Sequence, residues 1–169
     1  MTEIELERYV RLFKESVWAT ALCCVKNVSD ADDVTQDVFL ALYTYTGGFA
    51  SDEHVKAWLL RCAINRSRDI LRSHWYRFSE PLSAAEEVAA PGNDPGESLL
   101  PEIMKLGKKL RVTLYMHYYE GYTVKEIADM LGIKESAVKL RLVRGRKQLG
   151  EILSEERKEG HENGLQKDV

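Results

Sequence analysis

Apolar residues recur at intervals of three and four along the first half of the chain, with polar residues between them. This is the spacing of a helix that buries one side, and the alternating runs of β-branched residues typical of strands are missing. The apolar positions of the first two predicted helices are Ile4, Tyr9, Phe13 and Val17, then Val34, Val38 and Leu42. Gly47 and Gly48 end the second helix, and a third follows them.

The third predicted helix has two faces of different character. It begins near Ser51 and Asp52, whose short polar side chains can cap a helix, and it runs to about Tyr76. Its apolar arc holds Val55, Leu59, Cys62, Ala63 and Ile70, and its opposite arc holds Trp58, Arg61, Asn65, Arg68, Arg72 and Trp75. Rings between arginines suit unpaired bases, because a base can stack on a ring while arginine holds the backbone. The alternative is that the tryptophans belong to the core.

A helix-turn-helix is predicted in the second half of the chain. Thr123 and Glu126 match a capping box, Gly132 ends that helix, and another helix begins at Ser136. The inward arc of this last helix holds Val138, Leu142 and Leu149, and its outward arc holds Ser136, Lys139, Leu140, Val143, Arg144 and Lys147. Such outward side chains can bond guanine edges or phosphates and touch thymine methyl groups, as a recognition helix in the major groove does. The alternative is a solvated basic helix on the surface of a bundle.

The segment between the two halves is rich in proline and acid. Residues 79–102 contain all four prolines of the chain and neither lysine nor arginine. Such a composition does not sustain a long helix or a strand. The sequence therefore predicts an all-α protein of two small helical domains, residues 1–78 and 97–153, joined by a flexible acidic linker, residues 79–96. Residues 154–169, rich in Glu, Lys and Gly, are predicted to form a disordered tail.

Charge and cysteine content narrow the function. The 169-residue chain has a net charge of −3, so we expect it to bind duplex DNA weakly by itself. Cys23, Cys24 and Cys62 lack CxxC spacing and nearby histidines, so neither a disulfide nor a metal site is expected. The histidines are scattered without paired carboxylates or a nucleophile, which disfavours an enzyme. The absence of a long apolar run or a signal peptide predicts a cytoplasmic protein, and no cofactor is expected.

Three segments, in this order, resemble a bacterial RNA polymerase sigma factor of the extracytoplasmic-function (ECF) group of the sigma-70 family. They are DADDVTQDVFLALY from Asp30, WLLRCAIN from Trp58, and YTVKEIA from Tyr122 followed by VKLRL from Val138. The resemblance implies a protein without catalytic activity that binds core RNA polymerase and promoter DNA. It also implies regulation by an anti-sigma factor, which in this family is commonly membrane-bound.

The resemblance assigns roles to individual positions. Asp33, Gln36 and Asp37 would face the clamp of the polymerase largest subunit, although Asp33 alone is also explained by the helix dipole. Phe49 and Asn65 would line the pocket for an extruded base. The positions assigned to the −10 element are Phe49, Arg61, Asn65, Arg68, Arg72 and Trp75, and those assigned to the −35 element are Ser136, Lys139, Leu140, Arg141, Val143, Arg144 and Lys147.

Two positions depart from the family pattern, and two other functions stay open. Leu140 replaces a small polar residue, which suggests an altered base preference, and Gly145 replaces an alanine, which predicts helix flexibility costing about 1 kcal/mol. A stand-alone dimeric repressor or activator would bind its operator tightly without polymerase, and the acidic balance disfavours it. A sigma mimic that only sequesters an anti-sigma protein would have no use for Lys139, Arg141 and Arg144.

Overall fold

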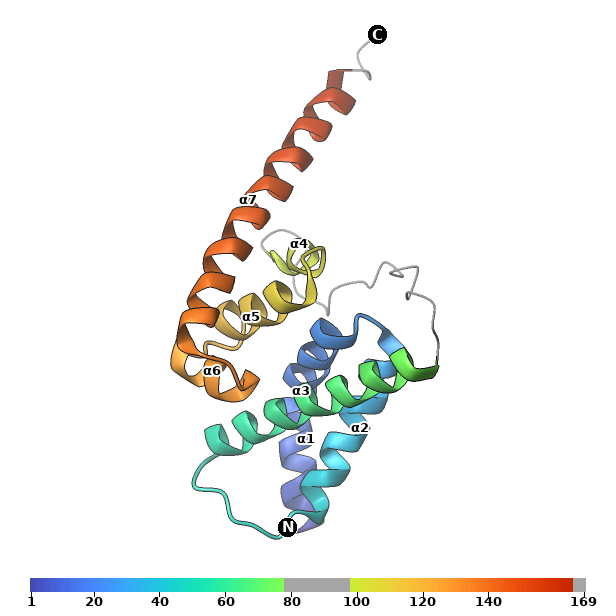
Figure 1. Cartoon of the computed structure of the whole chain (residues 1–169). Coiled ribbons are helices and arrows are strands. Elements are labelled where there is room, and N and C mark those ends of the chain that lie inside the picture. The colour runs from blue at the N-terminus through green and yellow to red at the C-terminus, as the bar shows by residue number, and fades with distance from the viewer. Residues whose placement is uncertain (78–97, 166–169) are drawn as a thin grey trace. The chain divides into compact units, whose positions relative to one another are not determined.

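The computed structural model describes residues 1–77 and 98–165, and all secondary structure in these two ranges is helical (Figure 1). The chain divides into two compact units, which we call the N-terminal unit (described residues 1–77) and the C-terminal unit (described residues 98–165). The predicted linker, residues 79–96, lies outside the described residues. The prediction of an all-α protein with two helical domains is confirmed.

Three helices pack pairwise against one another in the N-terminal unit: α1 (Glu3–Val25), α2 (Val28–Thr44) and α3 (Asp52–Arg77). Each of the first two begins at a side-chain cap. Thr2 and Glu5 form a capping box at α1, and the Asn27 side chain accepts the Asp30 amide at α2. The fully buried side chains at the centre of the unit include Val17, Leu22, Val34, Leu42, Leu59 and Ile64.

The first turns of α1 depart from the predicted pattern. Ile4 was expected on the buried side of the helix, but its side chain is 81% exposed. The buried residues of α1 begin only at Val17, whereas Tyr9 and Phe13 are half-buried and stack on each other with ring centroids 6.1 Å apart. The N-terminal end of α1 therefore lies at the edge of the bundle, and the prediction for Ile4 is wrong.

Four helices form the C-terminal unit: α4 (Leu100–Met104), α5 (Lys108–Tyr118), α6 (Val124–Leu131) and α7 (Glu135–Leu165). Helices α5 and α6 both pack against α7, as does α4. The core is built from Ile103, Leu114, Met116, Ile127, Val138 and Leu142. Burying each such side chain contributes about 1.5–3 kcal/mol, which holds the two helices of the helix-turn-helix against α5.

Helix α7 extends well beyond its predicted end. Residues 154–165 are helical, so the prediction of a disordered tail is wrong for this stretch, and residues 166–169 lie outside the described residues. Two contacts explain the continuation: Ile152 and Leu153 are half-buried, and Glu156 forms an ion pair with Lys105 just after α4. The Glu, Arg and Lys residues that follow are good helix formers, so the helix propagates past the packed region.

Gly145 has a packing role rather than the flexibility expected of it. It is buried on α7, and a Cβ atom at this position would lie 2.2 Å from Cδ1 of Leu114, which is fully buried on α5. A methyl group would force a side chain in a packed core to move. The glycine therefore permits the close approach of α5 and α7.

Candidate nucleic-acid interface

Helix α3 separates an apolar face from a polar one as its sequence predicts. Val55, Leu59 and Ala63 are fully buried, whereas Cys62 and Ile70 lie at the boundary and are only half-buried. The exposed positions on the other face are Arg61, Asn65, Arg68, Arg72 and Trp75. The Trp75 side chain is 78% exposed, which leaves a large aromatic surface available beside basic groups.

The loop between α2 and α3 is organised by a cluster of aromatic rings. The Phe49 ring centroid lies 5.0 Å from that of Tyr45, 5.7 Å from that of Trp58 and 5.4 Å from that of His54. Tyr45 and Trp58 are also 5.0 Å apart. Because each aromatic pair contributes about 0.5–1.5 kcal/mol beyond simple burial, the ring of Phe49 is held in one orientation. We call Tyr45, Phe49, His54 and Trp58 the loop cluster.

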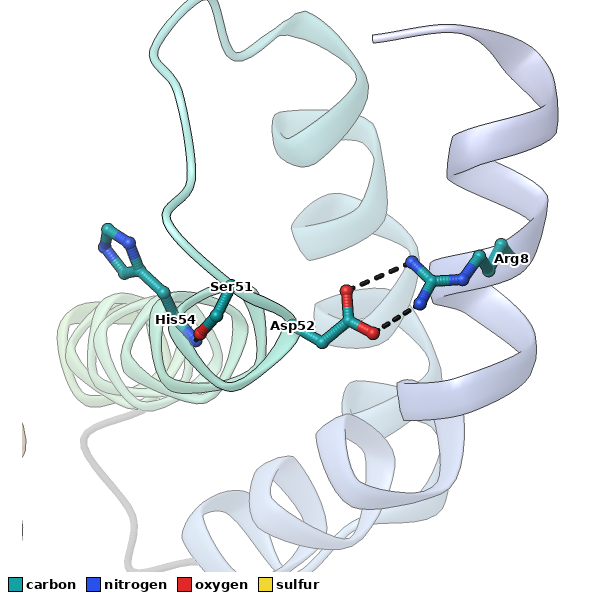
Figure 2. A network of polar contacts seen from close by, with 4 residues as sticks. All are labelled: Arg8, Ser51, Asp52 and His54. Carbon is teal, nitrogen blue, oxygen red and sulfur yellow. Dashed lines mark hydrogen bonds and ion pairs between the residues drawn. The ribbon is translucent and has the colours of Figure 1, made fainter.

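The start of α3 is fixed by polar contacts of Ser51 and Asp52 (Figure 2). The Ser51 hydroxyl accepts the His54 amide at 3.2 Å, which caps the helix as predicted. Asp52 receives two hydrogen bonds from the Arg8 guanidinium of α1, one of them at 3.1 Å. The hydrogen bond and charge of Arg8 lower the pKa of the Asp52 carboxyl below its ordinary value.

The acidic face of α2 divides into free and internally bonded groups. Asp33 and Gln36 are exposed. Asp37 instead accepts a hydrogen bond from Arg66 Nε of α3 at 2.8 Å, and Asp32 accepts one from Trp18 Nε1 of α1 at 2.7 Å. An external partner for Asp37 would therefore compete with Arg66. The sequence pattern did not reveal this internal hydrogen bond.

A groove of about 540 Å³ runs between α2 and α3 within the N-terminal unit. Asn65, Arg66 and Cys62 line it from α3, and burial raises the pKa of the Cys62 thiol, offset in part by the charge of Arg61. Phe49 is not among the residues that line this groove. The structure thus places Phe49 and Asn65, assigned above to one base pocket, in two different environments of the same unit.

The helix-turn-helix of the C-terminal unit has the predicted local structure. Thr123 and Glu126 form the capping box of α6, and Gly132 ends that helix with a φ of 65°, a conformation that favours glycine. Val138, Leu142 and Leu149 are buried on the inner side of α7. The exposed outer positions are Ser136, Lys139, Leu140, Val143, Arg144 and Lys147, whereas Arg141 is half-buried at the side of the helix.

One further arginine of α7 has a defined position that the sequence did not reveal. Arg146 Nη1 donates a hydrogen bond to the Tyr118 hydroxyl of α5 at 3.0 Å. The Tyr118 ring in turn packs edge-on against His117, with centroids 5.0 Å apart. Tyrosines repeat through the segment from Tyr115 to Tyr122, and this composition was the available signal.

Comparison with known proteins agrees with this arrangement. Residues 9–77 match the family model described as Sigma-70 region 2, and residues 97–149 match the model described as Sigma-70, region 4. RNA polymerase sigma factor CarQ from Myxococcus xanthus is 30% identical, over 78% of this chain and 79% of CarQ. The chain belongs to the sigma-70 family.

Within that family it is similar to members of the ECF group. The ECF RNA polymerase sigma factor SigW from Bacillus subtilis is 25% identical over 83% of this sigma factor and 84% of SigW. The share of the relative that is matched differs from one relative to another. The match to the probable RNA polymerase sigma factor RfaY from Xanthomonas campestris pv. campestris spans 38% of that protein. We therefore assign the sigma factor to the ECF group.

A solved structure shares the fold. The sigma factor RpoE from Bartonella quintana, solved in complex with the anti-sigma factor NepR, aligns with a TM-score of 0.68 at 19% identity. The alignment covers 89% of this sigma factor and 97% of RpoE. In the described part of the chain, no helix is long and apolar enough to span a membrane, and no cluster of metal-binding side chains occurs.

Proposed function

We propose that this sigma factor binds core RNA polymerase in the cytoplasm, directs it to promoters and helps open them, without catalytic chemistry of its own. The observation that carries the proposal is that the two units expose different kinds of surface. The N-terminal unit exposes Trp75 beside the arginines of α3, and the C-terminal unit exposes a basic face on the second helix of a helix-turn-helix. An exposed aromatic ring beside arginines suits unpaired bases, and a basic recognition helix suits a duplex.

The N-terminal unit would join the polymerase and the melted −10 element. Asp33 and Gln36 are exposed on α2 and are proposed to contact basic side chains of the polymerase clamp, with Asp37 beside them. On α3, the exposed arginines would follow the strand backbone while an extruded base meets Phe49 or Asn65. Extruding a base costs least where the duplex is already opening.

The C-terminal unit would read the −35 element as a duplex. Lys139, Arg144 and Lys147 are exposed on the outer face of α7 and can bond guanine edges or phosphates. Leu140 and Val143 are 48% and 57% exposed on the same face, and their apolar side chains suit thymine methyl groups. We expect a −35 sequence that contains thymine opposite these two residues.

Binding to polymerase makes two weak DNA contacts act together. With a net charge of −3, the chain does not attract phosphates strongly by itself. Once both units are held on the polymerase, each contact raises the effective concentration of the other. Strong promoter binding is therefore proposed to appear only in the holoenzyme.

An anti-sigma factor is the proposed regulatory partner. RpoE was solved with the anti-sigma factor NepR, and CnrH, at a TM-score of 0.60 and 23% identity, with the cytosolic domain of CnrY. A partner of this kind would cover the polymerase-binding or DNA-binding surfaces of either unit. Its identity, and whether it is membrane-bound, would follow from co-purification with the intact chain.

Run-off transcription with core polymerase on genomic fragments tests the proposal. We expect defined start sites that appear only when the sigma factor is added, and whose upstream sequences share two spaced elements. Failure to direct initiation from any fragment would refute the proposal. Tight operator binding without polymerase would indicate a stand-alone regulator, and binding to an anti-sigma factor without transcription would indicate a mimic.

A further inference from the structure

The loop between α2 and α3 is packed against its own aromatic side chains. A Cβ atom at Gly47 would lie 2.3 Å from the Tyr45 hydroxyl oxygen and 2.4 Å from the Tyr45 Cζ atom. The Tyr45 ring therefore lies directly against the glycine. The same ring contacts Phe49 and Trp58. These contacts give residues 45–51 a defined conformation in the absence of a ligand.

His54 joins the two ends of this arrangement. Its Nδ1 accepts the Ala50 backbone amide at 3.2 Å, and its ring meets the Phe49 ring edge-on at an interplanar angle of 82°. Because an amide N–H can only donate, Nδ1 must be the acceptor and the ring proton lies on Nε2. One side chain thus fixes both the backbone next to Phe49 and the Phe49 ring itself.

The helix turn that carries His54 is itself anchored. The Ser51 hydroxyl accepts the His54 amide, and Arg8 of α1 binds both carboxylate oxygens of Asp52 (Figure 2). The first turn of α3 is consequently tied to α1, a helix that contributes no residue to the proposed DNA surface. The backbone of His54 is therefore held relative to α1, and its side chain can position the loop.

We propose that His54 is a positioning residue for capture of an unpaired promoter base by Phe49. This inference rests on the proposed function, in which Phe49 contacts an extruded base of the −10 element. His54 would not touch DNA; it holds Ala50 and Phe49 in the arrangement that a base meets. Preorganisation of this kind lowers the entropy lost on binding, so its removal weakens base capture.

Substitutions of His54 separate its two contacts. In His54→Asn, Oδ1 stands where Nδ1 was, so the bond from the Ala50 amide can persist without the ring. His54→Gln is the matched control, because its acceptor lies one bond farther out. His54→Ala removes the acceptor and the ring together, and His54→Phe keeps a ring without an acceptor.

The experiment measures binding of holoenzyme to a fluorescent single-stranded oligonucleotide. The probe is the non-template −10 strand of a promoter mapped by run-off transcription, made both intact and with a single abasic site at each position in turn. For the intact strand, we expect His54→Ala to bind about tenfold more weakly, the scale of one base stacked on an aromatic ring. His54→Asn should bind more tightly than His54→Gln and His54→Ala.

The abasic series distinguishes positioning from a general structural role. At one abasic position, wild type and His54→Ala should bind equally, because the base held by Phe49 is missing. Equal binding of wild type and His54→Ala to the intact strand, or a loss that persists at every abasic position, would overturn the inference. Failure of the proposed function is recognised separately, because wild-type holoenzyme would then start no transcription.

Controls establish that the variants remain folded and docked. Their affinity for core polymerase and for a −35 duplex should match that of wild type, and His54→Asn and His54→Gln should unfold at similar temperatures because both lose the ring contact with Phe49. If His54→Ala unfolds early, the comparison of His54→Asn with His54→Gln still decides the question. Equal binding by these two variants would then contradict the role of the Ala50 hydrogen bond.

Discussion

The two units present their functional side chains in different ways. In the C-terminal unit, the proposed DNA contacts come from successive turns of one helix, from Ser136 to Lys147, and all of them except Arg141 are exposed. In the N-terminal unit the proposed polymerase and DNA contacts come from α2, the loop cluster and α3, and several are engaged within the protein, as Asp37 is by Arg66. The first surface is set by helical period, and the second depends on tertiary packing.

The largest effect is expected from Arg144 on the simpler of the two surfaces. Arg144→Ala should weaken binding to the −35 element by about 1–3 kcal/mol if this side chain reads a base. The matched change is Arg146→Ala on the same helix, because Arg146 is bonded to Tyr118 at the side of α7. Affinities should be measured on the mapped promoter and on a duplex with a changed −35 sequence.

The two variants should differ in specificity as well as in affinity. Arg144→Ala should lose discrimination at the one base pair that Arg144 reads and keep it elsewhere in the element, whereas Arg146→Ala should retain the preference of wild type and lose affinity evenly. A full preference for the mapped promoter in Arg144→Ala would remove Arg144 from base recognition. Helical period alone would then not identify which residues of the C-terminal surface read bases.

Gly145 tests how strictly the scaffold behind the C-terminal surface is packed. Gly145→Ala gains about 1 kcal/mol of helix propensity but overpacks Leu114, which costs about 1–3 kcal/mol, so we expect net destabilisation of about 1 kcal/mol. Chemical denaturation of the intact chain measures this free energy. The double variant Gly145→Ala with Leu114→Val should be less destabilised than the two single changes predict by addition.

A stabilising effect of Gly145→Ala alone would contradict this packing argument. It would mean that the Leu114 side chain can move aside without loss. The interface between α5 and α7 would then have spare room, and the glycine would be only the source of flexibility expected from sequence.

Features that depend on a single helix could be predicted from the sequence. Helical period identified the buried Val138 and Leu142 and the exposed Lys139 and Arg144, because one helix packed on one side needs no other information. The starts of α3 and α6 followed from local side-chain caps. The all-α fold was predictable for the same reason, since each helix carries its own pattern.

Features that join distant segments could not be read in this way. The pairing of Asp37 with Arg66 links residues 29 positions apart, and that of Glu156 with Lys105 links residues 51 apart. A pattern within one helix contains no signal for either. The same holds for Gly145, where the decisive neighbour, Leu114, lies on another helix.

A smaller effect should separate Asp33 from Asp37 on the N-terminal unit. Asp33→Ala should weaken binding to core polymerase by up to about 1 kcal/mol, the upper range for an exposed ion pair, and leave folding unchanged. Asp37→Ala also removes the bond to Arg66, so it should lower the unfolding temperature as well. Equilibrium binding and thermal unfolding of both variants make the test.

Arg66→Met is the control for this pair. It frees Asp37 without removing its charge, so it should bind polymerase at least as well as wild type if Asp37 faces the clamp. Weaker binding by Arg66→Met would show that the ion pair, rather than the free carboxylate, is the form that the polymerase recognises. An unchanged affinity in Asp33→Ala would remove Asp33 from the interface.

The smallest effect concerns the ion pair that anchors the first turn of α3. Arg8 lowers the pKa of Asp52 in the folded state, so the pair stabilises the fold above the ordinary carboxyl pKa of about 3.9 and ceases to do so as the pH falls through the lowered value. Arg8→Met should therefore unfold at a slightly lower temperature than wild type at neutral pH, and the difference should close in acid. Arg11→Met is the matched control, because Arg11 pairs with Glu7 of its own helix, at 3.6 Å. A gap between Arg8→Met and wild type that stays constant with pH would mean that packing of the Arg8 side chain, and not its bond to Asp52, ties α1 to the loop cluster.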